Sequence, residues 1–211
     1  MKKILLLTGV ACLLGTQANA IDMTPYVSAK LKYSMMEPEV DFDGGDKFDV
    51  DDKVIGGSLA LGLSSKVTGG AIRAELEYNK NADAEKSHHM YNIDYDSGLY
   101  VEDDGVLKVK TQSLFLNGYF DIDTNTKFTP YVGVGIGYTR MKGEFKFLGE
   151  KADAHDDTFS WQMGFGCGYA LNENVTAEIG YRYVDYGDFT DEGDKLESKA
   201  HEILAGIRYN F

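Results

Sequence analysis

The sequence is poor in cysteine, proline and positive charge, and each shortage excludes a class of protein. Of its two cysteines, Cys12 lies in a segment that we expect to be removed, so Cys167 has no partner for an intramolecular disulfide. The net charge of −13 disfavours contact with a phosphate backbone, so we expect no nucleic-acid partner. Three prolines against 24 glycines and 14 tyrosines favour long strands joined by polar loops.

Long hydrophobic runs are also absent, except for one short run at the start. Lys2 and Lys3 precede the apolar residues 4–14, and Ala18-Asn19-Ala20 offers a cleavage site of small residues. This pattern predicts a signal peptide over residues 1–20 and one domain over 21–211, which has a net charge of −15 once the two lysines are lost. The absence of an apolar helix does not exclude a membrane protein, because a spanning strand needs only about 9–11 residues.

What the chain does contain is a period of two. From Phe159 to Leu171 every second residue is large or apolar, and the residues between them are small or polar. This alternation is typical of a strand and does not fit a helix. A short turn at residues 172–174 separates it from a second alternating run that starts at Val175. The two runs therefore predict a hairpin with one apolar face.

The same unit recurs along the chain, with long and short connections in strict alternation. The predicted strands are residues 25–35, 54–63, 72–78, 112–122, 128–141, 159–171, 175–183 and 200–211. We therefore predict an all-β fold: an eight-stranded antiparallel up-and-down transmembrane β-barrel with long external loops and both termini on the periplasmic side. A ten-stranded barrel remains the alternative, if residues 90–109 form another spanning hairpin. A closed barrel has no free edge, so we expect a monomer.

The apolar rows are predicted to face lipid rather than the barrel interior. They contain bulky residues such as Trp161, Phe165 and Tyr181, which would not share a narrow eight-stranded lumen. The opposite rows are rich in glycine, which suits a crowded interior. The last strand ends on an alternating apolar row that closes with Tyr209 and Phe211.

These motifs resemble a known family. Residues 128–138, FTPYVGVGIGY, look like a recurrent strand of small OmpA-like and Opa-like outer-membrane barrels of the bacterial surface-antigen type, and 180–183 and 205–211 are similar to that family's last two strands. The resemblance implies a location in the Gram-negative outer membrane, contact with its lipid, and recognition of Tyr209 and Phe211 by the barrel-assembly machinery. It identifies an architecture more specifically than a function.

The inward rows are predicted to carry a network of charges. Five basic and four acidic residues leave this lumen at about +1, so most of the acidic excess falls in the loops. Buried charges must be paired or hydrated. The network is therefore either an ion-pair plug or a gated, water-filled path. Its members are Lys30, Lys32, Arg73, Glu75, Glu77, Glu178, Arg182, Glu202 and Arg208.

Three functions are compatible with these features. The first is a surface antigen or adhesin, or a structural protein, whose acidic, tyrosine-bearing loops offer a contact surface for a host or extracellular ligand. The second is a small porin-like channel. The third is an outer-membrane hydrolase, for which His155, Asp156 and Asp157, with the acidic cluster of residues 185–194, would supply the acid–base groups. We predict no enzyme and no cofactor. We also predict no metal site, since the acidic first loop departs from the calcium-loop pattern.

Overall fold

The computed structural model describes residues 23–41, 52–82, 84–93, 100–147, 150–191 and 194–211. None of these residues forms a helix long and apolar enough to cross a membrane. The strands are β1 (Met23–Asp41), β2 (Asp52–Val67), β3 (Gly70–Asn81), β4 (Ala84–Ile93), β5 (Tyr100–Ile122), β6 (Phe128–Phe147), β7 (Glu150–Ala170), β8 (Val175–Asp191) and β9 (Asp194–Asn210).

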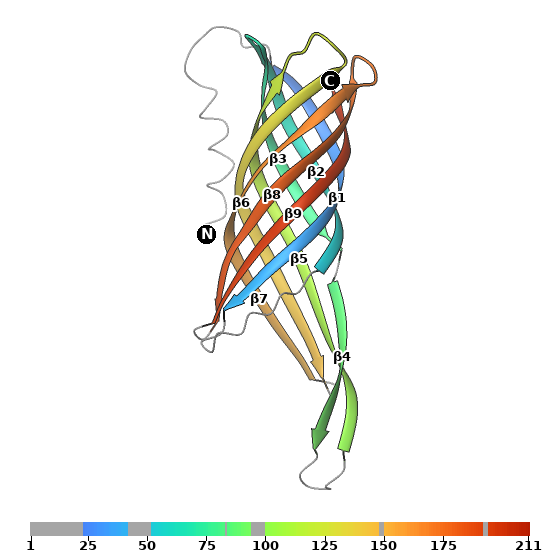
Figure 1. Ribbon diagram of the computed structural model, residues 1–211, viewed down its shortest axis with the longest axis vertical. Helices are drawn as coiled ribbons and strands as arrows, with labels where there is room; N and C mark the ends of the chain where they lie inside the picture. Colours follow the sequence, from blue (N-terminus) through green and yellow to red (C-terminus); the bar gives the residue numbers. More distant parts are fainter. Residues whose placement is uncertain (1–22, 42–51, 83, 94–99, 148–149, 192–193) are drawn as a thin grey trace.

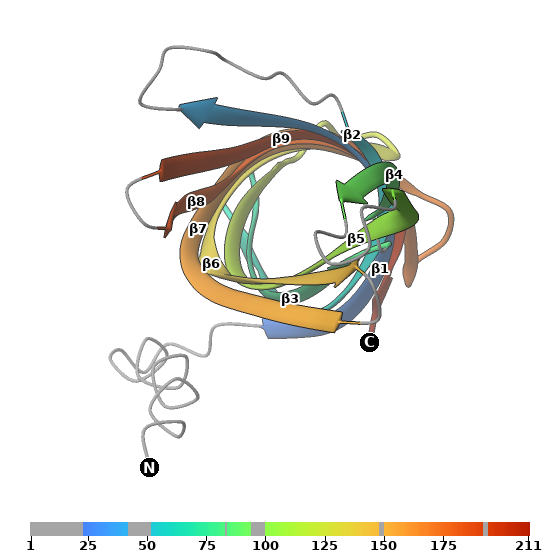
Figure 2. The same ribbon diagram turned by 90° about the horizontal axis from the view of Figure 1, so that it is seen from below.

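Eight of these strands close into a ring. Neighbours pair antiparallel in the order β3-β2-β1-β9-β8-β7-β6-β5, and the pairing of β3 with β5 completes the circle. The first and last strands pair from Tyr26 opposite Asn210 to Asp41 opposite Lys195. Figure 1 shows the tilted strands from the side, and Figure 2 shows the ring along its axis. The predicted eight-stranded barrel is confirmed.

The long polar segment between the third and fourth predicted strands is not the loop that we expected. Strand β4 pairs with the first part of β5, from Ala84 opposite Val109 to Ile93 opposite Tyr100. This hairpin projects beyond the barrel (Figure 1), and β4 has no other strand partner among the described residues. Residues 90–109 therefore do contribute an extra strand, but not a spanning one, and the ten-stranded alternative is wrong.

Other predicted loops are also largely strand. Strands β6 and β7 stay paired to Phe147 opposite Glu150, where a loop over 142–156 was expected, and β8 and β9 stay paired to Asp191 opposite Asp194. The charges in these segments suggested loops, but a strand beyond the membrane needs no apolar row. Period-two hydrophobicity therefore marks the membrane-spanning part and not the full strand.

The three short connections lie at the end of the barrel that also holds the C-terminus (Figure 1). In the β5–β6 turn, Asn125 takes a left-handed conformation (φ 53°) and its N–H donates to Asp123 Oδ1 at 2.8 Å. In the β7–β8 turn, Asn172 Oδ1 accepts from the N–H groups of Asn174 and Val175. Asparagine and aspartate suit such turns because they tolerate this conformation and bond their own backbone.

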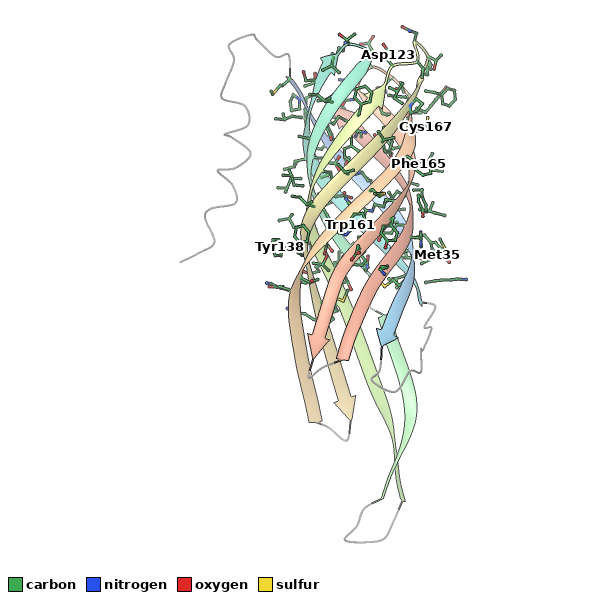
Figure 3. All side chains as sticks on the ribbon, turned by 60° about the vertical axis from the view of Figure 1, so that its left-hand side comes forward. Met35, Asp123, Tyr138, Trp161, Phe165 and Cys167 are labelled. Carbon is green, nitrogen blue, oxygen red and sulfur yellow. The ribbon has the colours of Figure 1, made fainter. Side chains whose placement is uncertain are left out.

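The outer face of the barrel is apolar, as predicted. Leu31, Leu59 and Val134 are each more than 60% exposed, which in water would be unfavourable but in lipid is the expected state. In Figure 3, side chains such as Tyr138, Trp161 and Met35 mark one end of this apolar zone, and Asp123 marks the opposite rim.

The inner wall is filled by pairing glycine with a large side chain across neighbouring strands. A Cβ on Gly133 would lie 2.2 Å from the Tyr119 ring, and a Cβ on Gly62 would lie 2.2 Å from the Tyr26 ring. The alternation had put Tyr26 on an inward row, but the sequence-based interpretation did not predict that such rings would pack against glycine. The glycine rows provide the room for them.

This packing predicts different costs for two glycines on paired strands. Gly133→Ala forces a methyl group into the Tyr119 ring and should destabilise the barrel by about 1–3 kcal/mol, the usual cost of overpacking. Gly118→Ala is the control, because its Cβ would meet nothing within 4 Å. Urea unfolding of both variants in lipid vesicles checks this, and equal stability of the two would contradict it.

Candidate functional site

The structure places all nine predicted lumenal charges on the inner wall. Their residues are at most 9% exposed, and they come from β1, β3, β8 and β9. They do not form one continuous cluster. They divide into two groups along the barrel axis, one of three bases and three acids and one of two bases and one acid.

The group nearer the long-loop end is a chain of six residues. Lys32 Nζ lies 2.9 Å from Glu202 Oε1, and Arg182 Nε lies 2.6 Å from Glu202 Oε2. Arg182 continues to Glu77 at 3.1 Å. Lys30 then joins Glu77 at 3.7 Å and Glu75 at 2.7 Å. Three cations and three anions alternate, so the chain is neutral.

Neutral donors complete the coordination of these carboxylates. Glu202 Oε1 accepts from Ser34 at 2.7 Å and from Tyr186 at 2.9 Å. Glu77 Oε2 accepts from Asn117 Nδ2 at 2.7 Å, and Asn117 in turn accepts from Gln162 at 2.6 Å. Hydrogen bonds of this kind offset the desolvation of a buried carboxylate.

The second group lies nearer the short turns and includes a residue that the sequence-based interpretation missed. Arg73 lies 2.8 Å from Asp121, and Arg208 lies 3.4 Å from the same carboxylate. Both guanidiniums also approach Glu178 Oε1, at 3.5 and 3.3 Å. Asp121 follows Asn117 and Tyr119 on the inward row of β5, so its parity was a signal that could have found it. Among the described residues the lumen thus holds five bases and five acids, and the predicted charge of +1 is corrected to zero.

Aromatic rings support the arginine of this second group. The Arg73 guanidinium carbon lies 4.5 Å from the Tyr119 ring centroid, 5.1 Å from Tyr131 and 5.9 Å from Tyr26. Arg208 lies 5.5 Å from the same Tyr26 ring. Cation–π contacts of this kind are worth about 2 kcal/mol or more when the groups are desolvated.

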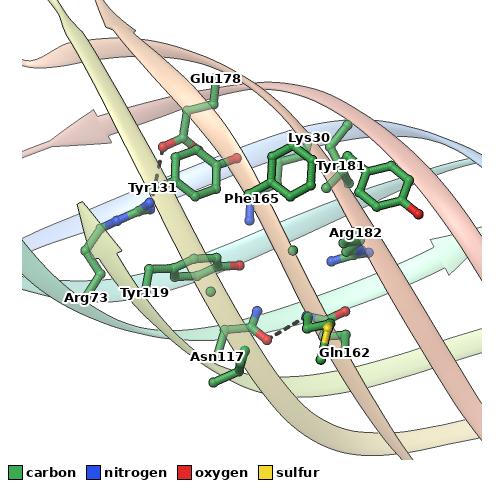
Figure 4. Close-up of a pocket in the computed structure, with 15 residues that line it drawn as sticks. Lys30, Arg73, Asn117, Tyr119, Tyr131, Gln162, Phe165, Glu178, Tyr181 and Arg182 are labelled. Atoms are coloured by element: carbon green, nitrogen blue, oxygen red, sulfur yellow. Dashed lines mark hydrogen bonds and ion pairs between the residues drawn. The ribbon is translucent and has the colours of Figure 1, made fainter. Parts of the chain in front are cut away.

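A small cavity lies between the two groups. The cavity at this level has a volume of about 30 Å³ and is lined by Arg73, Tyr119, Tyr131, Glu178 and Arg182, among others (Figure 4). A space of this size holds one or two water molecules.

An apolar cluster lies beyond the first charged group, toward the long-loop end. Phe115, Val184, Tyr186 and Ala200 are essentially inaccessible, and Met36 and Met141 pack against them. Tyr186 also donates to Glu202, so this cluster and the charged chain share a residue. Val184 and Tyr186 lie beyond the predicted strand 175–183, so the alternation pattern did not indicate this cluster.

Outside the lumen, basic side chains gather at one level of the barrel wall. Among the residues whose side chains the structure describes, six basic and two acidic ones, Asp157 and Asp185, face outward where the apolar zone ends toward the long-loop side. The six are Lys53, Lys80, Lys110, Arg140, Lys142 and Lys199. The acidic excess is elsewhere: 24 acidic and 6 basic residues fall within residues 37–52, 83–109, 143–156 and 188–198.

Comparison with known proteins agrees with this architecture. A family model for the outer membrane protein beta-barrel domain matches residues 4–211. The chain belongs to this family. It is an integral protein of the outer membrane, as the resemblance implied.

Sequence relatives of this outer-membrane barrel match part of its length. Outer membrane protein PagN of Salmonella typhimurium is 29% identical over 122 residues, which are 49% of this chain and 51% of PagN. Opacity protein opA65 of Neisseria gonorrhoeae is 25% identical over 126 residues, 47% of this chain and 52% of that protein. The chain thus spans about half the length of these relatives, and the Opa-like resemblance is confirmed.

Solved structures share the fold of this outer-membrane barrel at low sequence identity. Neisserial surface protein A superposes with a TM-score of 0.55 at 18% identity, covering 89% of this chain and 97% of that one. Ail, the attachment invasion locus protein of Yersinia pestis, was solved with the heparin analogue sucrose octasulfate. It gives a TM-score of 0.51 at 14% identity, covering 89% and 99%.

The structure also describes the predicted assembly signal and part of the predicted hydrolase cluster. Tyr209 and Phe211 are exposed on the outer face with ring centroids 5.2 Å apart, and the Phe211 N–H donates to the Pro25 carbonyl at 3.0 Å. Asp157 makes a two-point ion pair with Arg140, at 2.6 and 2.7 Å. The side chains of His155 and Asp156 lie outside the described part. No group of three metal-ligating residues occurs among the described residues.

The buried chain predicts a large effect for removal of one carboxylate. Glu202→Gln leaves Lys32 and Arg182 facing an uncharged amide, which should destabilise the barrel by about 3–5 kcal/mol. Asp157→Asn is the matched control, because its pair with Arg140 is about half exposed (side chains 49% and 52%) and should contribute little to stability. Urea unfolding would contradict the assignment if both variants lost equal stability.

Proposed function

We propose that this barrel is a surface adhesin, whose closed transmembrane part holds its external segments at the cell surface. The observation that carries the proposal is the separation of charge along the barrel axis. Two neutral groups of charged side chains occupy the lumen, with a cavity of about 30 Å³ between them, while the acidic excess falls in the four segments beyond the membrane. This arrangement favours a protein that displays its external segments over one that conducts through a pore.

A protein with the same fold supports the same function. Ail carries attachment and invasion in its name, and it shares this fold with similar coverage of both chains. The β4–β5 hairpin extends the surface available to a partner, since ten residue pairs continue the ladder outside the ring. We propose an extracellular ligand of host origin as that partner.

Adhesion should depend on the external segments and not on the lumen. Bacteria that express the chain should adhere to epithelial monolayers several-fold more than bacteria that lack it. Replacing residues 84–109 by a short Gly-Ser turn should abolish most of that gain. Glu178→Gln is the control, since it alters the lumen and leaves the external segments intact. Counting of bound cells, with surface proteolysis to verify insertion, checks this; undiminished adhesion without the hairpin would contradict its role.

The channel function is the second candidate, and conductance separates it from display. We expect no steady current from the refolded mature chain in a planar bilayer. Glu178→Gln leaves Arg73 and Arg208 with only Asp121 between them and should also remain silent, because the Tyr119 and Tyr131 rings still fill that level. Steady channels whose conductance changes in the variant would instead favour a porin.

We propose no catalytic role; within the hydrolase cluster, Asp157 is engaged by Arg140. We also propose that Phe211 serves assembly and that export removes residues 1–20. A Phe211 deletion that assembles normally in cells, or an exported chain that starts before Ile21, would contradict these assignments.

A further inference from the structure

The cavity between the two charged groups of the lumen carries polar side chains on its wall. Its volume is about 30 Å³, and its lining includes Lys30, Arg73, Gln162, Glu178 and Arg182 (Figure 4). Every residue that lines it belongs to the part of the chain that the structure describes. A water molecule needs about 10–15 Å³ of such space, so the cavity has room for about two.

The hydrogen bonds of Gln162 leave one acceptor of its side chain without a partner at this cavity. An ionised Glu77 can only accept, so Asn117 must donate to it through Nδ2, at 2.7 Å. The Asn117 oxygen then accepts from Gln162 Nε2 at 2.6 Å. This order fixes which end of the Gln162 amide is the oxygen. Gln162 Oε1 accepts no hydrogen bond from any described residue, although Gln162 is only 4% exposed.

A second acceptor of this kind lies on the wall of the same cavity. Glu178 Oε1 is 3.5 Å from Arg73 and 3.3 Å from Arg208, but neither contact has the geometry of a hydrogen bond. Gln162 is linked through Asn117 to the charged group nearer the long loops, whereas Glu178 belongs to the group nearer the short turns. The cavity therefore holds one unsatisfied acceptor from each group.

Both acceptors need a donor, and the surroundings limit what that donor can be. An anion would face the two acceptor oxygens. A metal cation would face Lys30, Arg73 and Arg182, which line the same cavity. A larger neutral molecule does not fit into about 30 Å³. Water satisfies every condition, because it is small, neutral and able to donate two hydrogen bonds, and buried water commonly pairs with polar groups that the protein leaves unpaired.

We propose that the cavity is a binding site for two water molecules that join the two charged groups. One water donates to Gln162 Oε1, the other donates to Glu178 Oε1, and the two waters bond to each other. A single network of hydrogen bonds and ion pairs then runs through the lumen, from Glu202 near the long loops to Asp121 near the short turns. This inference concerns the inside of the barrel and does not depend on adhesion.

Crystal structures of the mature, refolded chain test the site directly. We expect one ordered water at about 2.8 Å from Gln162 Oε1 and a second one at a similar distance from Glu178 Oε1. After a soak in sodium bromide, we expect no anomalous signal in the cavity. A bromide peak there would overturn the proposal, and so would a Gln162 oxygen that accepts directly from Lys30 or Arg182.

Two variants on β7 show whether Gln162 holds its water. Gln162→Met keeps the length of the side chain but removes the amide oxygen, so the water beside it should be lost. Ser160→Ala is the matched control, because Ser160 is the neighbouring inward residue, bonds to Thr139 at 2.7 Å and does not line the cavity. Both waters should remain in that variant. A water that persists in Gln162→Met would contradict the assignment.

Unfolding in urea tests whether the waters join the two groups. Gln162→Met and Glu178→Gln should each lower the urea midpoint, and the double variant should lower it by less than the sum of the two shifts, because the first change already breaks the bridge. Ser160→Ala combined with Glu178→Gln should give additive shifts. Additive shifts in both pairs would contradict the bridge. Should Gln162→Met fail to fold, the crystal structure of the unaltered chain and its bromide soak still decide.

Discussion

Ten ionised side chains share the inside of a ring of eight strands. The need to pair them determines which side chains meet on the inner wall. A single unpaired charge in such a space costs several kcal/mol, so each acid must meet a base from another strand. Glu202 on β9 meets Lys32 on β1 and Arg182 on β8, and Asp121 on β5 meets Arg73 on β3 and Arg208 on β9. These contacts link strands that are far apart in sequence, so they help to specify the register as well as to fill the lumen.

The glycine rows follow from the same constraint. Strong pairing requires that the long side chains reach across the lumen, and the aromatic rings that flank Arg73 need space beside them. Gly133 and Gly62 supply that space opposite Tyr119 and Tyr26. A smaller residue on one strand and a larger one on its neighbour is the same solution that layered cores use elsewhere.

The sequence allowed the barrel to be predicted because lipid imposes a period of two that nothing else in the chain imitates. The same rule explains the errors. Beyond the membrane the outward rows need not be apolar, so the ends of β6, β7 and β4 carry charges and were taken for loops. Parity could place Arg182 and Glu77 inside, but not decide that they meet, because that depends on the stagger of eight strands around the ring. Asp121 was missed on a strand whose alternation is less regular.

The hairpin of β4 and β5 affects how much conformational entropy would be lost when a partner binds. Six of its ten residue pairs, from His88 opposite Gly105 to Ile93 opposite Tyr100, lie beyond the pairing of β5 with β6 and correspond to about 20 Å of backbone, at about 3.4 Å per residue. A backbone that is already hydrogen-bonded loses less conformational entropy when it is bound than an open loop of the same length. Substitutions on such an arm can change which surface it offers while the ladder that holds it remains, so that variation in recognition and constancy of shape are separated in one element.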